Sequence, residues 1–166
     1  MKKSVLKVQM FGTYSIEYEG NPVSFERNTT TKTNQLMQIL LQAGEKGVTR
    51  AKLLSDLFGD EEMSNPANSL RATVFRLRRL LAAAGLAEDE YLTIKGGSYY
   101  WTSGIPYELD AHQFEELLKK AEKENDPEKK KSYIEEACEL YRGEFLPQLG
   151  AEGWAVVLNV YYKNLF

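Results

Sequence analysis

The sequence predicts a mixed α+β fold in two parts, an α+β domain over residues 1–105 and an all-α domain over residues 106–166. In the first 25 residues apolar and polar side chains alternate, and this period of two indicates half-buried strands. Three stretches follow in which apolar residues lie three and four positions apart, and such spacing indicates helices. Two strand-like runs joined by a glycine pair come next, and from Pro106 onward the pattern is helical throughout.

The composition indicates a folded protein without a membrane segment. Of the 166 residues, 43% are hydrophobic, which is enough apolar material for packed cores and argues against a disordered chain. Unbroken apolar runs, such as residues 80–84, are far shorter than the roughly 20 residues of a membrane-spanning helix. The first residues lack the apolar segment of a signal peptide, and the single cysteine, Cys138, cannot form an internal disulfide. We therefore expect a cytoplasmic protein.

The N-terminal strands are expected to form a small antiparallel sheet. Alternation over residues 6–10 and 14–18 predicts two strands, which Gly12 divides. The turn at residues 19–21 then leads to a short third strand over residues 22–25, so that the three strands follow one another as a meander.

Each of the first two helices is expected to begin at a threonine and to end at a glycine. The threonine cluster at residues 29–31 can cap a helix that Gly44 closes, and Thr49 can cap a second helix that ends at Gly59. The apolar stripes are Leu36, Ile39, Leu40 and Ala43 in the first helix and Leu53, Leu54, Leu57 and Phe58 in the second. One face of each helix is therefore expected to be buried.

The third helix, over residues 65–84, has the strongest signal in the sequence. Asn65 is a favourable N-cap, Pro66 is typical of the first helical position, and Gly85 follows the expected end. One face is apolar at spacings of four, three and four residues, through Leu70, Val74, Leu77 and Leu81. The same segment contains no acidic residue and four arginines, Arg71, Arg76, Arg78 and Arg79. One face of this helix is thus expected to pack on the core, and the other is basic.

The acidic residues are concentrated in the second part of the chain, which accounts for the net charge of −3. Residues 1–105 contain thirteen Lys and Arg against eleven Asp and Glu, whereas residues 106–166 contain eight against thirteen. The third helix can therefore attract phosphate groups although the whole chain is acidic.

The order of these elements predicts a winged helix-turn-helix. The runs Tyr91–Ile94 and Tyr99–Thr102, joined by residues 95–98, predict a β-hairpin. Strands, three helices and a hairpin in this order are typical of winged helices, in which helices two and three form the helix-turn-helix and the hairpin is the wing. Because such folds place the exposed face of one helix in the major groove of duplex DNA, we expect residues 65–84 to form the recognition helix.

The exposed face of that helix supplies the candidate base contacts. With the apolar stripe turned inward, an advance of about 100° per residue directs six residues outward, namely Asn68, Arg71, Ala72, Phe75, Arg76 and Arg79. Arg71 and Arg76 are expected to make bidentate contacts to guanine, and Asn68 is a further candidate for a base edge. Ala72 and Phe75 can touch a thymine methyl group.

The candidate phosphate contacts come from three elements. Arg78 and Arg79 lie further along the third helix, and Thr49 and Arg50 lie at the positive end of the second helix. Lys95, at the tip of the wing, can reach the DNA backbone or the minor groove.

Two alternatives stand beside this interpretation. Arginines on an exposed helix face commonly interact only with water, although four of them without an acidic residue, beside an exposed Phe75, favour DNA contact. The alternative function is that of a protein–protein interaction module in which neither domain contacts DNA.

The second part is expected to contain successive amphipathic helices and no catalytic site. Asp110 and Gln113 resemble a capping box, Asp126–Pro127 can begin another helix, and a last apolar pattern runs from Trp154 to Leu165. The one histidine, His112, lies among acidic residues in the first turn of a helix, and Cys138 has no histidine near it in sequence and is expected to be at least half-buried. One histidine and one cysteine cannot form an ordinary zinc site, so neither an enzyme nor a cofactor is expected.

Three motifs in order give the sequence a family resemblance. They are Leu70-Arg71-x-x-Val74-x-Arg76-Leu77-Arg78, Asp110-x-x-x-Phe114 and Tyr141-Arg142-Gly143-Glu144-Phe145-Leu146. The chain resembles the antibiotic-regulatory (SARP) class of bacterial transcriptional activators, in which an OmpR-type winged helix precedes a helical bacterial transcriptional activation domain. The resemblance covers nearly the full length of the chain.

The resemblance implies how such a protein acts. It implies binding to direct repeats near promoters, usually as a head-to-tail homodimer, and activation of transcription through contact with RNA polymerase. It also implies tetratricopeptide-like helix pairs in the second domain, as the succession of amphipathic helices independently suggests. In the family the activation domain continues well beyond the position of Phe166, so only its first part is expected here.

Overall fold

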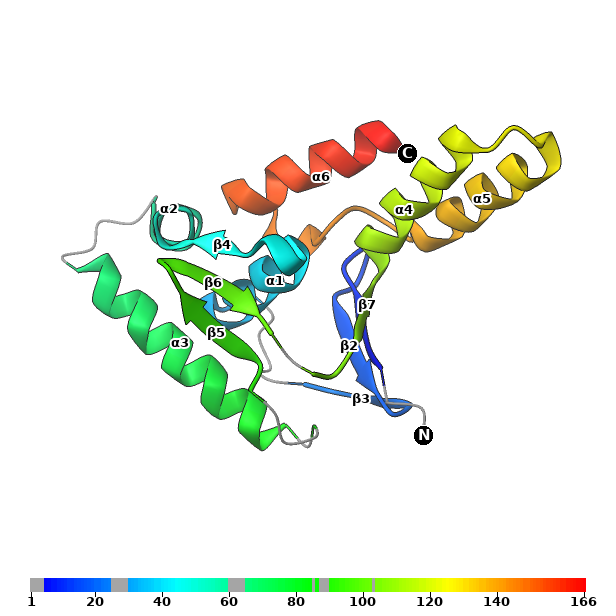
Figure 1. The fold of residues 1–166 in the computed structure, drawn as a ribbon. Helices are drawn as coiled ribbons and strands as arrows, with labels where there is room; N and C mark the ends of the chain where they lie inside the picture. The colour runs from blue at the N-terminus through cyan, green and yellow to red at the C-terminus, as the bar shows by residue number, and fades with distance from the viewer. Residues whose placement is uncertain (1–4, 25–29, 60–64, 85, 87–89, 103) are drawn as a thin grey trace. The chain divides into compact units, whose positions relative to one another are not determined.

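The computed structural model describes residues 5–24, 30–59, 65–84, 86, 90–102 and 104–166 (Figure 1). The chain divides into two compact units, of which the first contains Met1–Val5 and Tyr18–Pro106 and the second Leu6–Glu17 and Tyr107–Phe166. The division after Pro106 lies one residue from the expected boundary, but the first strands belong to the second unit. We therefore correct the expected first domain of residues 1–105 in this respect.

The first unit contains the expected three helices and wing. Its elements are β3 (Asn21–Pro22), α1 (Lys32–Ala43), the 3-10 turn η1 (Gly44–Lys46), β4 (Val48–Thr49), α2 (Arg50–Phe58), α3 (Pro66–Ala83), β5 (Leu92–Lys95) and β6 (Ser98–Trp101). β4, β5 and β6 form a three-stranded antiparallel sheet in the order β4-β6-β5. Figure 1 shows α3 alongside the hairpin of β5 and β6.

The helix boundaries follow the expected capping residues. The hydroxyl of Thr31 accepts a hydrogen bond from the backbone N–H of Asn34, and that of Thr49 accepts one from Lys52. Gly44 closes α1 with a φ of 63°, a conformation that favours glycine. Gly59 is the C-cap of α2. These four predictions, made from local sequence, are confirmed.

In the first unit one strand is shorter than predicted, and one short strand was not predicted. The expected strand over residues 22–25 is limited to Asn21–Pro22, and Phe25 lies outside the described residues. Val48–Thr49 forms a short strand before α2, because Val48 pairs with Tyr99 and Thr49 with Ser98. Gly85, the expected stop of the third helix, lies outside the described residues, and Ala84 is the C-cap of α3.

The second unit combines a small sheet with four helical segments. Its elements are β1 (Leu6–Gln9), β2 (Ser15–Tyr18), β7 (Tyr107–Leu109), α4 (Asp110–Lys123), α5 (Pro127–Leu140), the 3-10 turn η2 (Pro147–Leu149) and α6 (Gly153–Leu165). The strands lie in the order β2-β1-β7, and α4 and α5 pack side by side as a helical hairpin (Figure 1).

The pairing of β1 explains why the first strands join the second unit. β1 runs parallel to β7, with Leu6 opposite Tyr107 and Val8 opposite Leu109. Alternation in the sequence predicts that residues 6–10 form a strand, but it does not predict the partner strand. The N-terminal sheet therefore contains a parallel strand, β7, that the alternation in the first 25 residues did not predict.

An aromatic cluster forms the core of the second unit. The ring of Phe11 lies 5.4 Å from that of Phe114 and 5.2 Å from that of Tyr162, both edge to face, and all three side chains are buried. Phe145 completes the cluster, 5.3 Å from Tyr162. Because edge-to-face pairs add to the free energy gained from burial, the cluster stabilises the packing of α4 and α6 around Phe11, two residues after β1.

Asp110 does not form the expected capping box. Its carboxylate accepts hydrogen bonds from the backbone N–H groups of Met10 at 2.8 Å, Phe11 at 3.0 Å and Ala111 at 2.8 Å. Leu109 occupies the N-cap position of α4, without a side-chain cap. Burial raises the pKa of the Asp110 carboxyl above its usual range, while the three N–H groups and the charge of Arg142 act in the opposite direction.

Only part of the apolar pattern expected in the last helix is buried. Trp154, Ala155 and Tyr162 are buried, whereas Val157 is 69% exposed and Val160 is 52% exposed. The sequence is apolar on both sides of α6, so periodicity alone did not distinguish the buried side. No helix in the described part of the chain is long and apolar enough to cross a membrane.

Candidate nucleic-acid interface

Helix α3 has one buried face and one basic face. Leu70, Val74, Leu77 and Leu81 are each no more than 5% exposed. The residues expected to point outward are all exposed, namely Asn68, Arg71, Ala72, Phe75, Arg76 and Arg79. The spacing of the buried residues and the face that the helix exposes therefore agree with the sequence-based expectation. Between Asn65 and Ala84 the exposed charges are all positive.

The start of α3 is fixed by its cap. The Asn65 side chain accepts a hydrogen bond from the backbone N–H of Asn68 at 3.2 Å, and Pro66 follows at the first helical position. An Asn cap of this kind stabilises a helix by about 1 kcal/mol. The cap defines where the exposed residues of the first two turns begin, since Asn68 and Arg71 are three and six residues further on.

Two arginines on the exposed face are held by neighbours one turn earlier in the helix. Arg71 Nη1 donates to Asn68 Oδ1 at 3.2 Å. The guanidinium carbon of Arg79 lies 5.8 Å from the centroid of the Phe75 ring, within the range of a cation–π contact. The positive groups of the helix are thus partly oriented in the protein alone.

Arg78 contacts the wing. Its Nη2 donates to the backbone carbonyl oxygen of Leu92 at 3.4 Å, which joins α3 to β5. Arg78 was expected to contact phosphate only, and the local sequence has no signal for its bond to Leu92. A guanidinium has five N–H donors, so the contact leaves donors for a phosphate.

The wing turn lies next to the start of α2. The backbone N–H of Arg50 donates to the carbonyl oxygen of Gly97 at 3.0 Å, and Thr49 pairs with Ser98 across the sheet. Gly96 and Gly97 have φ values of 59° and 77°. A two-residue hairpin turn of type I′ requires such positive φ values at both of its central residues. The structure thereby brings Thr49 and Arg50 close to the wing turn. Lys95, the last residue of β5, directly precedes this turn.

The hydroxyl of Thr49 already caps α2. Its oxygen accepts from the backbone N–H of Lys52 at 3.2 Å, so a phosphate contact by Thr49 would use its O–H as donor. The first backbone N–H groups of α2 add a partial positive charge at the same place.

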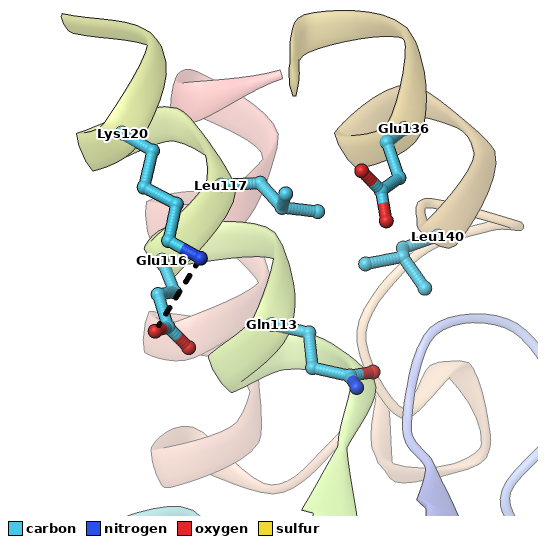
Figure 2. A pocket seen from close by; sticks show the side chains of 6 residues that line it. All are labelled: Gln113, Glu116, Leu117, Lys120, Glu136 and Leu140. Atoms are coloured by element: carbon cyan, nitrogen blue, oxygen red, sulfur yellow. Dashed lines mark ion pairs between the residues drawn. The ribbon is translucent and has the colours of Figure 1, made fainter. Parts of the chain in front are cut away.

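A groove between α4 and α5 in the second unit has a different character (Figure 2). It has a volume of about 220 Å³ and is lined by Gln113, Glu116, Leu117, Lys120, Glu136 and Leu140. Glu116 and Lys120 form an ion pair at 4.0 Å, drawn as the dashed line in Figure 2. These six residues supply neither a nucleophile with a neighbouring base nor a basic surface for phosphate.

The described residues contain no group of three or more His, Cys, Asp or Glu that could hold a metal ion. Cys138 is exposed on α5, contrary to the expectation that it is at least half-buried. The ring of His112 lies 6.4 Å from that of Tyr107.

Comparison with known protein families gives a match within the first unit. The family described as "Transcriptional regulatory protein, C terminal" matches residues 26–101, which include α1, α2, α3 and the wing. Residues 26–101, here called the regulatory domain, are therefore similar to the OmpR/PhoB-type winged helix of transcriptional regulators, as the sequence predicted.

Two relatives extend the likeness beyond the regulatory domain. Protein RcaC of Microchaete diplosiphon is 28% identical over 123 residues, which are 69% of this chain and 18% of RcaC. The structure of Mycobacterium tuberculosis EmbR, in complex with a low affinity phosphopeptide, has a TM-score of 0.76 at 18% identity. That match covers 99% of this chain and 42% of the EmbR chain, so the α+β fold with a helical second part is confirmed. The chain thus spans less than half of the EmbR chain and about a fifth of RcaC.

Proposed function

We propose that this chain is a sequence-specific regulator of transcription that binds double-stranded DNA with α3 in the major groove. The observation that carries the proposal is the orientation of α3, with Leu70, Val74, Leu77 and Leu81 in the core and three arginines on the opposite, exposed face. A helix docked in this way can offer hydrogen-bond donors to base edges and phosphates. The family of residues 26–101 supports the same conclusion.

The proposed base contacts come from the middle of the exposed face. Arg71 and Arg76 contact guanine, Asn68 and Ala72 lie beside them, and Phe75 is exposed on the same face. Each bidentate arginine contact discriminates against a wrong base by about 1–3 kcal/mol.

The proposed phosphate contacts surround this face. Arg78 and Arg79 lie toward the end of α3, and Thr49, Arg50 and Lys95 come from α2 and the wing. The proximity of Thr49 and Arg50 to the wing turn supports this grouping, since the backbone N–H of Arg50 is hydrogen-bonded to the carbonyl oxygen of Gly97. Phosphate contacts fix the orientation of the helix on the duplex, and base contacts then select the sequence.

The wider role is proposed from the family resemblance. We infer an activator in the cytoplasm that binds direct repeats near promoters as a homodimer and contacts RNA polymerase through its helical second part. The exposed apolar side chains of α6 are compatible with contacts to another protein.

Titration of labelled genomic duplexes with the whole chain at several salt concentrations tests the DNA proposal. Because phosphate binding releases counterions, the logarithm of the affinity is expected to fall linearly with the logarithm of salt concentration, with a slope of about −0.9 for each phosphate contact. Lys129→Ala is the matched control, since it removes one exposed positive charge from α5. It is expected to leave both affinity and slope unchanged.

A flat salt response, or no binding, would contradict DNA binding and favour the protein interaction module. Selection of duplexes from a random pool would then give no enriched motif. An enriched motif repeated in one direction at a fixed spacing would support the direct-repeat proposal.

A further inference from the structure

Phe75 is an unusual side chain for a helix face in contact with water. Its ring is 63% exposed, the largest exposure among the large apolar side chains described in the first unit. It does not contribute to the core, because Leu70, Val74, Leu77 and Leu81 form the buried face of α3. An exposed ring at this position therefore needs an explanation other than folding of the helix.

The ring of Phe75 contacts the guanidinium of Arg79, which lies on the same face of the helix. Arg79 follows Phe75 by four residues, so the two side chains are neighbours on the helix surface. The guanidinium carbon lies 5.8 Å from the ring centroid, where the ring's electron-rich face attracts a cation. A guanidinium stacked on a ring keeps its N–H groups at the edge of its plane, where they can donate to an anion.

From this contact we propose that Phe75 is a positioning residue, which holds the guanidinium of Arg79 ready for a DNA phosphate. The inference rests on the proposed function and changes the role that the sequence analysis gave to Phe75, namely contact with a thymine methyl group. A flexible arginine loses side-chain freedom when it binds, and a contact that restricts it beforehand reduces that loss.

The neighbouring pair on α3 follows the same pattern with a different chemistry. Arg71 is hydrogen-bonded to Asn68, three residues earlier, at 3.2 Å. Each of these two arginines therefore contacts a residue in the preceding turn of the helix. The partner of Arg71 is Asn68, and the partner of Arg79 is Phe75. The Phe75 ring is accordingly assigned to Arg79 alone.

Ring-current shifts in the free chain test the contact without DNA. The side-chain CH₂ protons of Arg79 are expected to resonate upfield in the NMR spectrum of the wild type and of Phe75→Tyr, which keeps the ring. In Phe75→Leu, which keeps an apolar side chain without a ring, they are expected to return to ordinary values. Equal shifts in all three proteins would overturn the proposal.

DNA titrations of the same variants test the consequence. A cation–π contact at an exposed site corresponds to an affinity change of about two- to five-fold, so Phe75→Leu is expected to weaken binding by this factor. The loss is expected to be equal on the preferred duplex and on random DNA, because phosphates carry no sequence information. Phe75→Tyr is expected to retain affinity, and all variants are expected to keep the thermal midpoint of the wild type.

A double-mutant cycle with Arg79→Ala separates positioning from direct contact. In the Arg79→Ala background, Phe75→Leu is expected to have no further effect. A full additional loss, or a loss confined to the preferred duplex, would overturn positioning and assign the ring to a base. If the wild type lacks salt-dependent binding altogether, the proposed function fails, whereas wild-type binding with an additive cycle overturns only the role of Phe75.

Discussion

The carboxylate of Asp110 accepts a hydrogen bond from the backbone N–H of Met10, 100 positions earlier in the sequence, at 2.8 Å. A second bond from Phe11, at 3.0 Å, follows it. These bonds lie at the first residue of α4, directly after the parallel pair of β1 and β7. They join the N-terminal strand to the helical hairpin within the second unit.

Asp110→Ala is expected to lower the free energy of unfolding of the second unit by about 2–5 kcal/mol, because the three buried N–H groups of Met10, Phe11 and Ala111 lose their acceptor. Urea unfolding followed by tyrosine and tryptophan fluorescence measures this change. Gln113→Ala is the matched control, since the capping box that would have involved Gln113 does not form; its effect is expected to stay within about 0.5 kcal/mol. Equal effects of the two substitutions would show that the bonds of Asp110 do not stabilise the unit.

The same carboxyl predicts a pH dependence of stability. Burial raises the pKa of Asp110, so the folded chain binds this proton more tightly than the unfolded chain does. The group therefore contributes stability at pH below its usual pKa, and this contribution is lost as pH rises through the raised pKa of the folded state.

Asp110→Asn, which is uncharged at every pH, is expected to lack this component. Thermal midpoints of both proteins from about pH 3.5 to about pH 7 test it, a range that begins just below the usual pKa of aspartate. The midpoint of the wild type is expected to fall relative to that of the variant as pH rises. A constant difference between the two proteins would mean that the pKa of Asp110 is the same in the folded and unfolded chain.

Gly47→Ala is expected to destabilise the first unit and loosen the attachment of the wing. Gly47 has a φ of 69°, and a Cβ there would overlap the ring of Tyr100 on β6. Gly20→Ala is the matched control, with a φ of 79° and open space around the added carbon. Both substitutions strain the backbone by about 1–2 kcal/mol. Because of the overlap, Gly47→Ala is expected to lower the free energy of unfolding by about 1–3 kcal/mol more. Identical unfolding curves for the two variants would contradict a close approach of Tyr100.

Arg71→Ala and Arg76→Ala are expected to reduce affinity for the preferred duplex more than for random DNA, by a factor that corresponds to about 1–3 kcal/mol. Arg79→Ala is expected to weaken both alike and to reduce the salt slope by about 1. Titrations of the three variants on both duplexes make the comparison. Equal losses on both duplexes for all three would mean that these arginines contact phosphates and select no base.

Much of the regulatory domain could be predicted because its signals are local. The caps Thr31, Thr49 and Asn65 each bond a backbone N–H three residues later, so a short stretch of sequence contains both partners. The orientation of α3 follows from the spacing of its four buried residues, which leaves one way to turn the helix toward a core. The wing turn required the positive φ that Gly96 and Gly97 adopt.

Other features of the site depend on contacts that no local pattern contains. The bond from Arg78 to Leu92 and the bond from Arg50 to Gly97 join segments that are 14 and 47 positions apart. The strand β4 is only two residues long, and it exists because β6 lies beside it. The ring contact of Phe75 with Arg79 is local, but it depends on a rotamer of each side chain that spacing alone does not select.

The sequence by itself determined the helices, their caps, the wing turn and the basic face of α3, because periodicity, capping and turn geometry act over a few residues. The tertiary structure alone decided that β1 pairs with β7, that Asp110 binds Met10 and Phe11, and which side of α6 is buried. The physical reason is that an alternating strand, a carboxylate or an apolar helix face can be satisfied by many partners. Which partner it meets depends on the packing of residues that lie far apart in the chain.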